Sequence, residues 1–330
     1  MMSIEPSESS PHLLADVGGT NVRFALDDGA AGRDDVTVLT TRDYPSLMAA
    51  IRHYLAGRGV LGRRVRRGAV GIANPVWGDQ IRMTNHDWSF SIEAMRRELS
   101  WDAFIVLNDF AALAHALPGM PPADLLRIGG AAGGTQAPCV LVGPGTGLGV
   151  CSLVPSSAGP VAVPGEGGHV AFAPQTEQEI RLWHFMHSRF PRVSCERLLC
   201  GDGLSYIHAF ISGVALASSL GEGDLLAPQA ITEGALEGGD RACLETLDLF
   251  CAMLGALAGD LALTLGARGG VFIGGGIVPR LGDHVLRSPL RARFEAKGRM
   301  SDYLRDVPVD VILNPYAALA GLSAVSRHRT

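Results

Sequence analysis

An amide and a carboxylate stand side by side in the middle of the chain, at the point where an apolar run ends. The run FIVL at 104–107 is followed by Asn108 and Asp109, and then by an alanine- and leucine-rich stretch. A positioned carboxylate can act as a general base, so the pair could belong to a catalytic site. Asn and Asp are also among the preferred N-cap residues of helices. The pair alone therefore supports helix capping as well as it supports catalysis.

A second set of polar side chains follows later in the chain. The stretch PGEGGH at 164–169 places Glu166 and His169 three residues apart among glycines, with too few bulky side chains around them to form a core. A zinc site would need further ligands, and no cysteine cluster or second histidine follows at ligand spacing. Glu196 stands at what looks like a helix start, where an acid taken alone is explained by the helix terminus or by an ion pair.

Glycine-rich turns follow apolar strands at three places, at 18–19, 143–149 and 274–276. Such turns expose several N–H groups and form concavities that bind phosphates. Three of them favour a nucleoside triphosphate as ligand. A dinucleotide fold is disfavoured, because its G-x-G-x-x-G fingerprint runs from a strand into a helix. Here the 143–149 loop runs into the strand-like segment 150–153 instead.

Asp16 stands at the end of the first strand, beside the first glycine turn. A carboxylate there would repel phosphate unless a divalent cation lay between them. We therefore expect Mg²⁺ on the phosphate oxygens, with Asp16 holding its water shell. The alternative is that Asp16 caps the turn through a local hydrogen bond.

Composition narrows the functional classes. The chain has 330 residues, 47% of them hydrophobic, and a formal net charge of −5. This length favours two domains, and the negative charge argues against nucleic-acid binding. Lys297 is the only lysine. This excludes a P-loop, which needs a lysine directly after its glycine loop, and a protein kinase, which needs one on a strand after its own glycine loop. Its charged neighbours predict that Lys297 is exposed.

No targeting or membrane segment is recognisable. The N-terminus is polar and lacks the pattern of a signal peptide, and the apolar stretch 249–265 is interrupted by Asp260, so we expect a buried helix there. The six cysteines form no CxxC pair, which predicts reduced thiols and a cytoplasmic protein.

The order of expected elements suggests a duplication. Strands at 13–15 and 22–26 enclose the first glycine turn, and strands at 140–142 and 150–154 enclose the second in the same plan. We expect an α/β protein with a small domain at 11–118 plus 310–330, a large domain at 119–309, and a disordered extension at 1–10. Periodicity predicts helices whose ranges are 44–55, 91–99, 177–188, 203–216, 241–265 and 316–325.

These features together resemble one known family. The segments DVGGTNVRFAL, MTNHDWSFS, LNDFAALAHALP, GPGTGLGV, PGEGGHVAFAP, VSCERLLCG and GGVFIGGGIVPR resemble the bacterial glucokinase family, of the proteobacterial type without zinc. This family lies in the hexokinase/actin-like ATPase superfamily, and the resemblance runs from about residue 13 to beyond 315. It implies a two-lobed actin-like ATPase (ribonuclease H-like) fold with an internally duplicated core and a ligand cleft between the lobes.

The resemblance also implies roles for individual residues. Five would bind the hydroxyls of a hexose, and the second of them would also be the base for its 6-hydroxyl: Asn108, Asp109, Glu166, His169 and Glu196. Others would hold the phosphates and the adenosine of ATP: Ala15, Asp16, Val17, Gly18, Gly19, Thr20, Gly145, Thr146, Gly147, Gly274, Gly275 and Gly276. The implied reaction is phosphorylation of D-glucose at O6 by ATP and Mg²⁺, in a homodimer with no nucleic-acid or membrane partner.

Other functions stay open on the sequence. The substrate could be another hexose, such as fructose or mannose, or the protein could be a sugar sensor without catalysis. An actin-like ATPase or phosphatase would also have the glycine hairpins, but gives no reason for the five polar residues assigned to the hexose. Trp77, in NPVWGD, is a bulky residue at a turn to which no role can be assigned.

Overall fold

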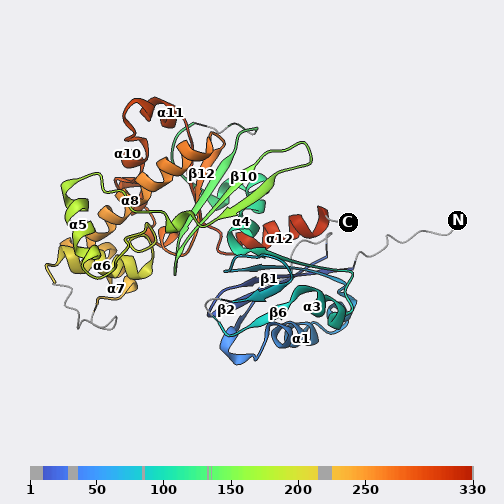
Figure 1. Ribbon diagram of the computed structural model, residues 1–330. Helices are drawn as coiled ribbons and strands as arrows, with labels where there is room; N and C mark the ends of the chain where they lie inside the picture. Colours follow the sequence, from blue (N-terminus) through green and yellow to red (C-terminus); the bar gives the residue numbers. More distant parts are fainter. Residues whose placement is uncertain are drawn as a thin grey trace. The chain divides into compact units, whose positions relative to one another are not determined.

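The computed structural model describes residues 10–28, 36–83, 86–131, 134, 136–214 and 225–328. The chain divides into two units, which Figure 1 shows coloured along the sequence. Unit 1 comprises Met1–Met120 and Tyr316–Thr330, and unit 2 comprises Pro121–Pro315. The expected extension at 1–10 lies outside the described residues, apart from residue 10.

Unit 1 is built on a five-stranded sheet with the order β3-β2-β1-β4-β7. Its strands are β1 (His12–Val17), β2 (Asn21–Asp27), β3 (Thr37–Thr40), β4 (Arg67–Ile72) and β7 (Ala103–Asn108). β1, β2 and β3 are antiparallel neighbours, whereas β1, β4 and β7 run parallel. The carboxyl ends of these three parallel strands therefore meet at one edge, here called the carboxyl edge of unit 1. Ligands of open α/β sheets bind at such edges.

Helices cover both faces of this sheet (Figure 1). Alternate residues of β1 point to opposite faces: Leu13 packs with α1 (Leu47–Gly57) and α3 (Ile92–Leu99), and Leu14 packs with α4 (Asp109–Ala116) and α12 (Ala317–His328). The remaining elements of unit 1 are η1 (Thr41–Asp43), α2 (Gly59–Arg64), β5 (Gln80–Arg82), β6 (Ser89–Ser91) and η2 (Leu117–Gly119). The sequence did not predict α2, whose two glycines lower its helix propensity.

The C-terminal helix α12 packs closely on α4. A Cβ added to Gly321 would lie 1.8 Å from the carbonyl oxygen of Ala112, so only glycine allows this approach. Farther along α12, Ser323 and Arg327 both donate hydrogen bonds to the buried carboxylate of Asp27 on β2. The last segment of the chain is thus fixed to the first hairpin.

Unit 2 repeats the sheet order of unit 1. Its six strands follow the order β11-β10-β9-β12-β13-β8, and they are β8 (Leu125–Gly129), β9 (Cys139–Pro144), β10 (Leu148–Val154), β11 (Val161–Gly165), β12 (Gly270–Ile273) and β13 (Val309–Ile312). The first five in this order match β3-β2-β1-β4-β7 in position and in direction. The predicted duplication is confirmed.

The strand β13 corrects one predicted boundary. The predicted first domain includes 310–315, but Val309–Ile312 pairs with β12 and β8 inside the sheet of unit 2. In the repeated plan β13 corresponds to β7, so its place follows from the duplication. The division therefore falls at residue 316 and not at 310.

Unit 2 has its main core around one long helix. The helices and short 3-10 turns are η3 (Pro122–Asp124), η4 (Gly167–His169), α5 (Glu177–His187), α6 (Gly201–Ile211), α7 (Pro228–Leu236), α8 (Arg241–Leu265), η6 (Val278–Leu281), α9 (His284–Arg287), α10 (Leu290–Glu295), η7 (Gly298–Met300) and α11 (Ser301–Arg305). α8 is long and apolar enough to cross a membrane, but 78% of its most apolar window is buried inside the structure. It is the core helix that the sequence predicted, and Phe250 and Leu254 on it are completely buried.

The side chain of the single lysine is largely buried, which contradicts the exposure predicted from its charged neighbours. The side chain of Lys297 is only 7% exposed, and its Nζ contacts the Asp260 carboxylate and donates to the carbonyl oxygen of Ala256 at 2.8 Å. Gly259 has no Cβ to block this path, since one would lie 2.7 Å from Cε of Lys297. The lysine therefore joins α8 to the segment after α10.

The six cysteines are all free thiols in the described residues, and five of them are buried. Burial raises the pKa of Cys251 to about 12 and that of Cys195 to about 11. Neither forms a thiolate near neutral pH, so they are inert core residues.

The stability of unit 1 is expected to depend on the protonation of His12. Its Nδ1 lies 2.6 Å from Oγ of Ser326 on α12, and burial lowers the pKa of the imidazole. Below about pH 6.5 the unfolded chain therefore takes up a proton more readily than the folded chain. The free energy of unfolding decreases as the pH is lowered from there to the pKa of the folded state. Urea midpoints at pH 8 and pH 5.5 measure this loss.

His12→Asn should reduce the loss, because asparagine keeps a hydrogen-bonding group but does not titrate. His53→Asn, at an exposed histidine on α1, should keep the loss of the wild-type protein. An unchanged pH dependence in His12→Asn would contradict the prediction.

Candidate functional site

Asn108 and Asp109 lie at the carboxyl edge of unit 1, where β7 passes directly into α4. Oδ1 of Asn108 accepts hydrogen bonds from the N–H groups of Phe110 and Ala111 at 3.0 and 3.1 Å, so Asn108 is the N-cap of α4. Its Nδ2 donates to Oδ1 of Asp109 at 3.0 Å, and the Phe110 N–H lies 2.9 Å from the same oxygen. Capping is therefore done by Asn108, while its amide and the helix terminus hold the Asp109 carboxylate in place.

The first glycine turn lies at the same edge, after β1. The side chains of Ala15 and Val17 are completely buried in the sheet, so of the predicted segment only Asp16 and the turn at 18–20 can be reached by a ligand. Thr41 fixes this turn: its Oγ1 donates to the carbonyl oxygen of Gly19 at 2.8 Å, and its N–H donates to that of Thr20. Sequence reasoning missed this role of Thr41, because the contact depends on the pairing of β2 with β3.

Asp16 is paired with an arginine across the hairpin. Asp16 and Arg23 are direct partners in the β1–β2 register, and Nη1 of Arg23 donates to Oδ2 of Asp16 at 3.0 Å. Burial raises the pKa of the Asp16 carboxyl, and Arg23 offsets part of that rise. The sequence analysis did not predict this pair, although the hairpin places the two residues opposite each other.

In unit 2, the three predicted hexose-binding residues come together. The chain at 168–172 runs beside 193–196, with a bridge between Ala171 and Ser194 and a hydrogen bond from the Glu196 N–H to the carbonyl oxygen of Gly168. As a result the His169 imidazole lies between two carboxylates, 3.8 Å from Glu166 and 3.6 Å from Glu196.

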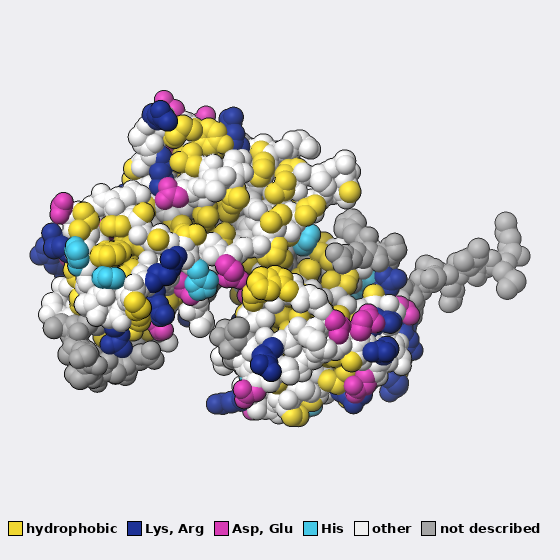
Figure 2. Space-filling view, viewed as in Figure 1, with side chains coloured by type: hydrophobic (Ala, Val, Ile, Leu, Met, Phe, Trp, Pro, Cys, Tyr) yellow, Lys and Arg dark blue, Asp and Glu magenta, His cyan; other side chains and the backbone are white. Residues whose placement is uncertain are grey.

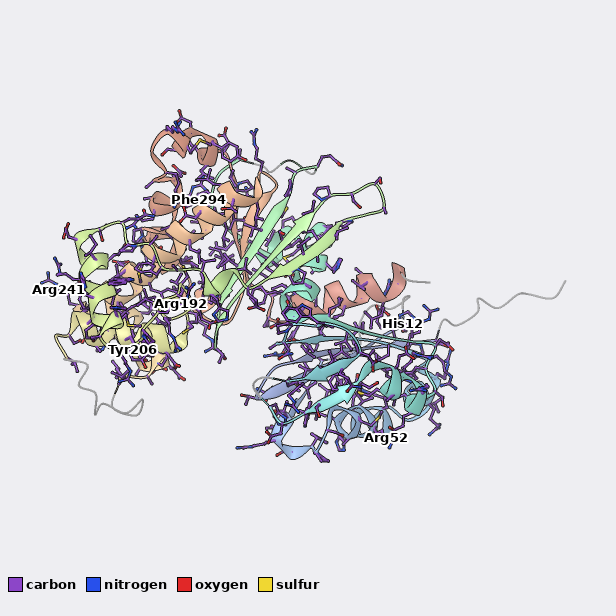
Figure 3. The ribbon with its side chains drawn as sticks, in the orientation of Figure 1. His12, Arg52, Arg192, Tyr206, Arg241 and Phe294 are labelled. Carbon is purple, nitrogen blue, oxygen red and sulfur yellow. The ribbon has the colours of Figure 1, made fainter. Side chains whose placement is uncertain are left out.

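An arginine side chain holds the backbone of His169 in place. Arg192, labelled in Figure 3, donates to the carbonyl oxygen of His169 at 3.0 Å. Both Glu166 and His169 are well exposed, which leaves them accessible to a ligand. No group of three or more His, Cys, Asp or Glu side chains among the described residues is arranged to hold a metal ion.

Glu196 also contacts the second glycine turn, which the sequence did not predict. Its Oε2 accepts a hydrogen bond from the Leu148 N–H at 2.9 Å, at the end of the 145–147 turn. A Cβ on Gly147 would lie 2.6 Å from that oxygen. Glu196 is in a turn and not at a helix start as expected, since α6 begins at Gly201 with Cys200 as its N-cap. The polar set and the glycine turn of unit 2 are therefore one connected structure.

The second and third glycine turns lie side by side in unit 2. The Cβ position of Gly145 is 4.0 Å from the backbone nitrogen of Gly276. The N–H of Gly274 donates to the carbonyl oxygen of Val142, so it is not available to a ligand, and Gly275 has a positive φ of 79° that favours glycine. The N–H of Gly201 donates to the carbonyl oxygen of Gly145, so α6 starts at the same place.

A cavity of about 500 Å³ opens beside these two turns. It is lined by residues of α6, α7 and the segment after β12: Leu204, Pro228, Gln229, Thr232, Glu233, Leu236, Glu237, Gly276, Ile277 and Arg280. Apart from Gly276, the sequence did not predict these lining residues, because on α7 they look like the ordinary polar face of a helix. Polar and charged side chains make up about half of this lining, and apolar side chains make up most of the rest.

The described groups can carry out two kinds of binding. Exposed N–H groups of glycine turns suit phosphates, and the carboxylates, amide and imidazole suit the hydroxyl groups of a polyol. Together with two units that repeat one strand order, they define a sugar kinase with the actin-like ATPase fold.

Comparison with known proteins identifies the family within that class. A family model described as Glucokinase matches residues 13–329. A glucokinase of Chromobacterium violaceum is 52% identical over 323 residues, which cover 98% of this chain and 91% of that protein. The chain belongs to the glucokinase family, and it is an enzyme that phosphorylates glucose.

Solved structures share the fold. The crystal structure of a glucokinase from an Antarctic psychrotroph is 33% identical with a TM-score of 0.84, and it covers 96% of this chain and 99% of its own. A ROK family glucokinase from Streptomyces griseus, solved in complex with glucose and AMPPNP, is 20% identical with a TM-score of 0.62 and covers the same shares. At that identity the second likeness shows the fold alone.

Proposed function

We propose that the enzyme transfers the γ-phosphoryl group of Mg–ATP to O6 of D-glucose, with Asp109 as the general base. The observation that carries this proposal is the geometry around Asp109. The N–H of Phe110 and the amide of Asn108 fix one carboxylate oxygen at 2.9 and 3.0 Å. Phosphoryl transfer depends mainly on positioning and charge stabilisation, and a fixed carboxylate can take the proton as the 6-hydroxyl attacks.

Five polar side chains are the proposed ligands of the hexose hydroxyl groups: Asn108, Asp109, Glu166, His169 and Glu196. A site whose polar groups are matched to hydroxyls rejects sugars that lack them, because those groups would stay unpaired.

ATP is bound by the glycine turns and by the cavity beside them. The accessible turns at 18–20 and 145–147 take the phosphates, and the cavity next to Gly276 takes the adenosine. Its volume fits a nucleoside, and it lies beside the 145–147 turn, as the connection between base and phosphates requires.

Asp16 would hold the magnesium ion through its water shell. Oδ2 of Asp16 is bound by Arg23, whereas Oδ1 accepts no hydrogen bond from the described residues and can accept one from a metal-bound water. The residues present therefore fit the group. Mg²⁺ would neutralise the charge on the phosphate oxygens, and Arg23 would keep the Asp16 carboxylate oriented.

A coupled assay of ADP release with a panel of hexoses tests the proposed function. Release that depends on glucose supports it, and turnover with fructose or mannose above that with glucose would favour the alternative substrates. Binding of glucose without any ADP release would indicate a sugar sensor and contradict the proposal.

Gly276→Ala tests the nucleotide part separately. Nothing lies within 4 Å of a Cβ at this position, so the methyl group disturbs no protein contact. If adenosine binds against Gly276, the KM for ATP should rise by about 10-fold or more, because the backbone can no longer approach the ligand closely. Gly57→Ala, at an equally open position in α1, should leave that KM unchanged. An unchanged KM in Gly276→Ala would place the nucleotide elsewhere.

The remaining expectations are part of the same proposal. We propose a cytoplasmic homodimer without a nucleic-acid or membrane partner. The net charge of −5 supports the absence of a nucleic-acid partner, and so does the mixture of basic and acidic side chains on the face seen in Figure 2. Sedimentation at several protein concentrations would measure the oligomeric state.

A further inference from the structure

We propose that the indole of Trp77 covers glucose bound at the carboxyl edge of unit 1 and shields the 6-hydroxyl from water. This inference rests on the proposed function, since it assumes that the sugar binds at Asn108 and Asp109. It assigns a role to a residue for which the sequence indicated none.

The exposure of Trp77 is the first observation. Trp77 is 85% exposed, the highest value among the exposed large hydrophobic residues that the structure describes. Trp88 and Trp101 in the same unit are only 2% and 4% exposed. An indole carries a large apolar area and usually packs against something, so Trp77 is placed for contact with a group outside unit 1's own core.

The second observation is the position of its loop. β4 lies between β1 and β7 in the sheet, so the segment after β4 leaves the carboxyl edge between the first glycine turn and the Asn108–Asp109 pair. The N–H of Ala73 donates to the carbonyl oxygen of Val17 at 3.2 Å. Nδ2 of Asn108 lies 3.5 Å from the carbonyl oxygen of Asn74. Trp77 follows Asn74 by only three residues, which keeps it close to the proposed sugar site.

The third observation is that the loop is fixed on both sides of Trp77. Val76 packs against the core of unit 1. The carboxylate of Asp79 accepts hydrogen bonds from Oγ of Ser91 at 2.6 Å and from the N–H of Glu93 at 2.8 Å. The backbone on both sides of Trp77 is therefore fixed.

The chemistry of the substrate matches this placement. A pyranose has hydroxyl groups at its rim and C–H groups on its faces. The site residues supply polar partners for the rim, and an indole supplies the apolar surface that a C–H face lacks. Excluding water matters in this reaction, because water competes with the 6-hydroxyl for the phosphoryl group.

Quenching of tryptophan fluorescence by acrylamide tests the burial directly. Saturating glucose should reduce the accessible fraction in the wild-type protein and in Trp183→Phe, which removes a half-buried tryptophan of unit 2. The reduction should be lost in Trp77→Phe, which lacks the reporting indole. Protection that depends on protein concentration and not on glucose would show that a second copy covers Trp77, and would overturn the proposal.

Binding and leakage give the functional test. In Trp77→Ala the Kd for glucose, measured by calorimetry, should rise by about 10-fold, and at saturating glucose ADP release should exceed the formation of glucose 6-phosphate. Trp77→Phe should stay within about 2-fold of the wild-type Kd, since it keeps an aromatic face. A Kd in Trp77→Ala within 2-fold of wild type would overturn the inference, provided that its unfolding midpoint is unchanged.

These outcomes separate the two proposals. If ADP release by the wild-type protein does not depend on glucose, the proposed function fails. If that release depends on glucose but Trp77→Ala behaves as wild type, only the role of Trp77 fails.

Discussion

Asp109→Asn is expected to lower the turnover number for glucose by about 100- to 10,000-fold. Asparagine has the same shape, and its oxygen can still accept hydrogen bonds from Phe110 and Asn108, so the start of α4 should be unchanged. The asparagine amide cannot accept the proton of the 6-hydroxyl, so general-base catalysis is lost. Turnover is measured by coupled ADP release. The affinity for glucose, measured by calorimetry, should change by no more than about 3-fold.

A matched control for this variant lies at the other end of β7. Asp102 is an exposed carboxylate next to the opposite end of β7, away from the carboxyl edge. Asp102→Asn removes the same charge from the same unit and should keep the wild-type turnover. Near-normal turnover in Asp109→Asn would contradict the role of Asp109 as the base.

Gly321→Ala should strongly destabilise unit 1. The added methyl group would meet the carbonyl oxygen of Ala112 at 1.8 Å, and both partners belong to helix backbones that cannot move independently. Overpacking of this kind costs about 3 kcal/mol, which corresponds to a fall of about 10 °C in the melting temperature. Calorimetric melting measures the change.

This variant should also impair catalysis, because α4 carries Asp109 at its first residue and would be pushed from α12. Gly57→Ala provides the comparison: it also lies in a helix of unit 1, with nothing within 4 Å of its Cβ. There alanine should be neutral or slightly stabilising, owing to its higher helix propensity. Equal melting temperatures for the two variants would show that α12 can adjust its distance from α4.

The duplicated fold was predictable because its signal is local. Apolar strands enclosing glycine turns recur at 13–26 and 140–154, and both form the expected antiparallel hairpins. Gly143 is the counterpart of Asp16 in this plan, since each residue precedes the last residue of its strand. The misplaced strand at 309–312 has no such local signal, because its sheet partners are distant in the sequence.

The positions of the proposed site residues were predictable where they follow from the end of a strand, and not where they depend on tertiary contacts. Asn108 and Asp109 follow a strand, so their place at its carboxyl edge could be predicted. The contact between Glu196 and Leu148 depends on how the chain at 193–196 crosses unit 2, which no local pattern encodes. The pocket residues of α7 were missed for the same reason, and so was the burial of Lys297, where charged neighbours in the sequence were a misleading guide to the environment in space.

The burial of Lys297 has a practical consequence for chemical labelling. A reagent that acylates side-chain amines has one target of this kind in the whole chain, and that amine is held between Asp260 and the backbone of α8. Acylation at this position therefore requires α8 and the segment after α10 to separate first. The rate of acylation reports how often this part of unit 2 opens, in the same way that amide hydrogen exchange reports local unfolding.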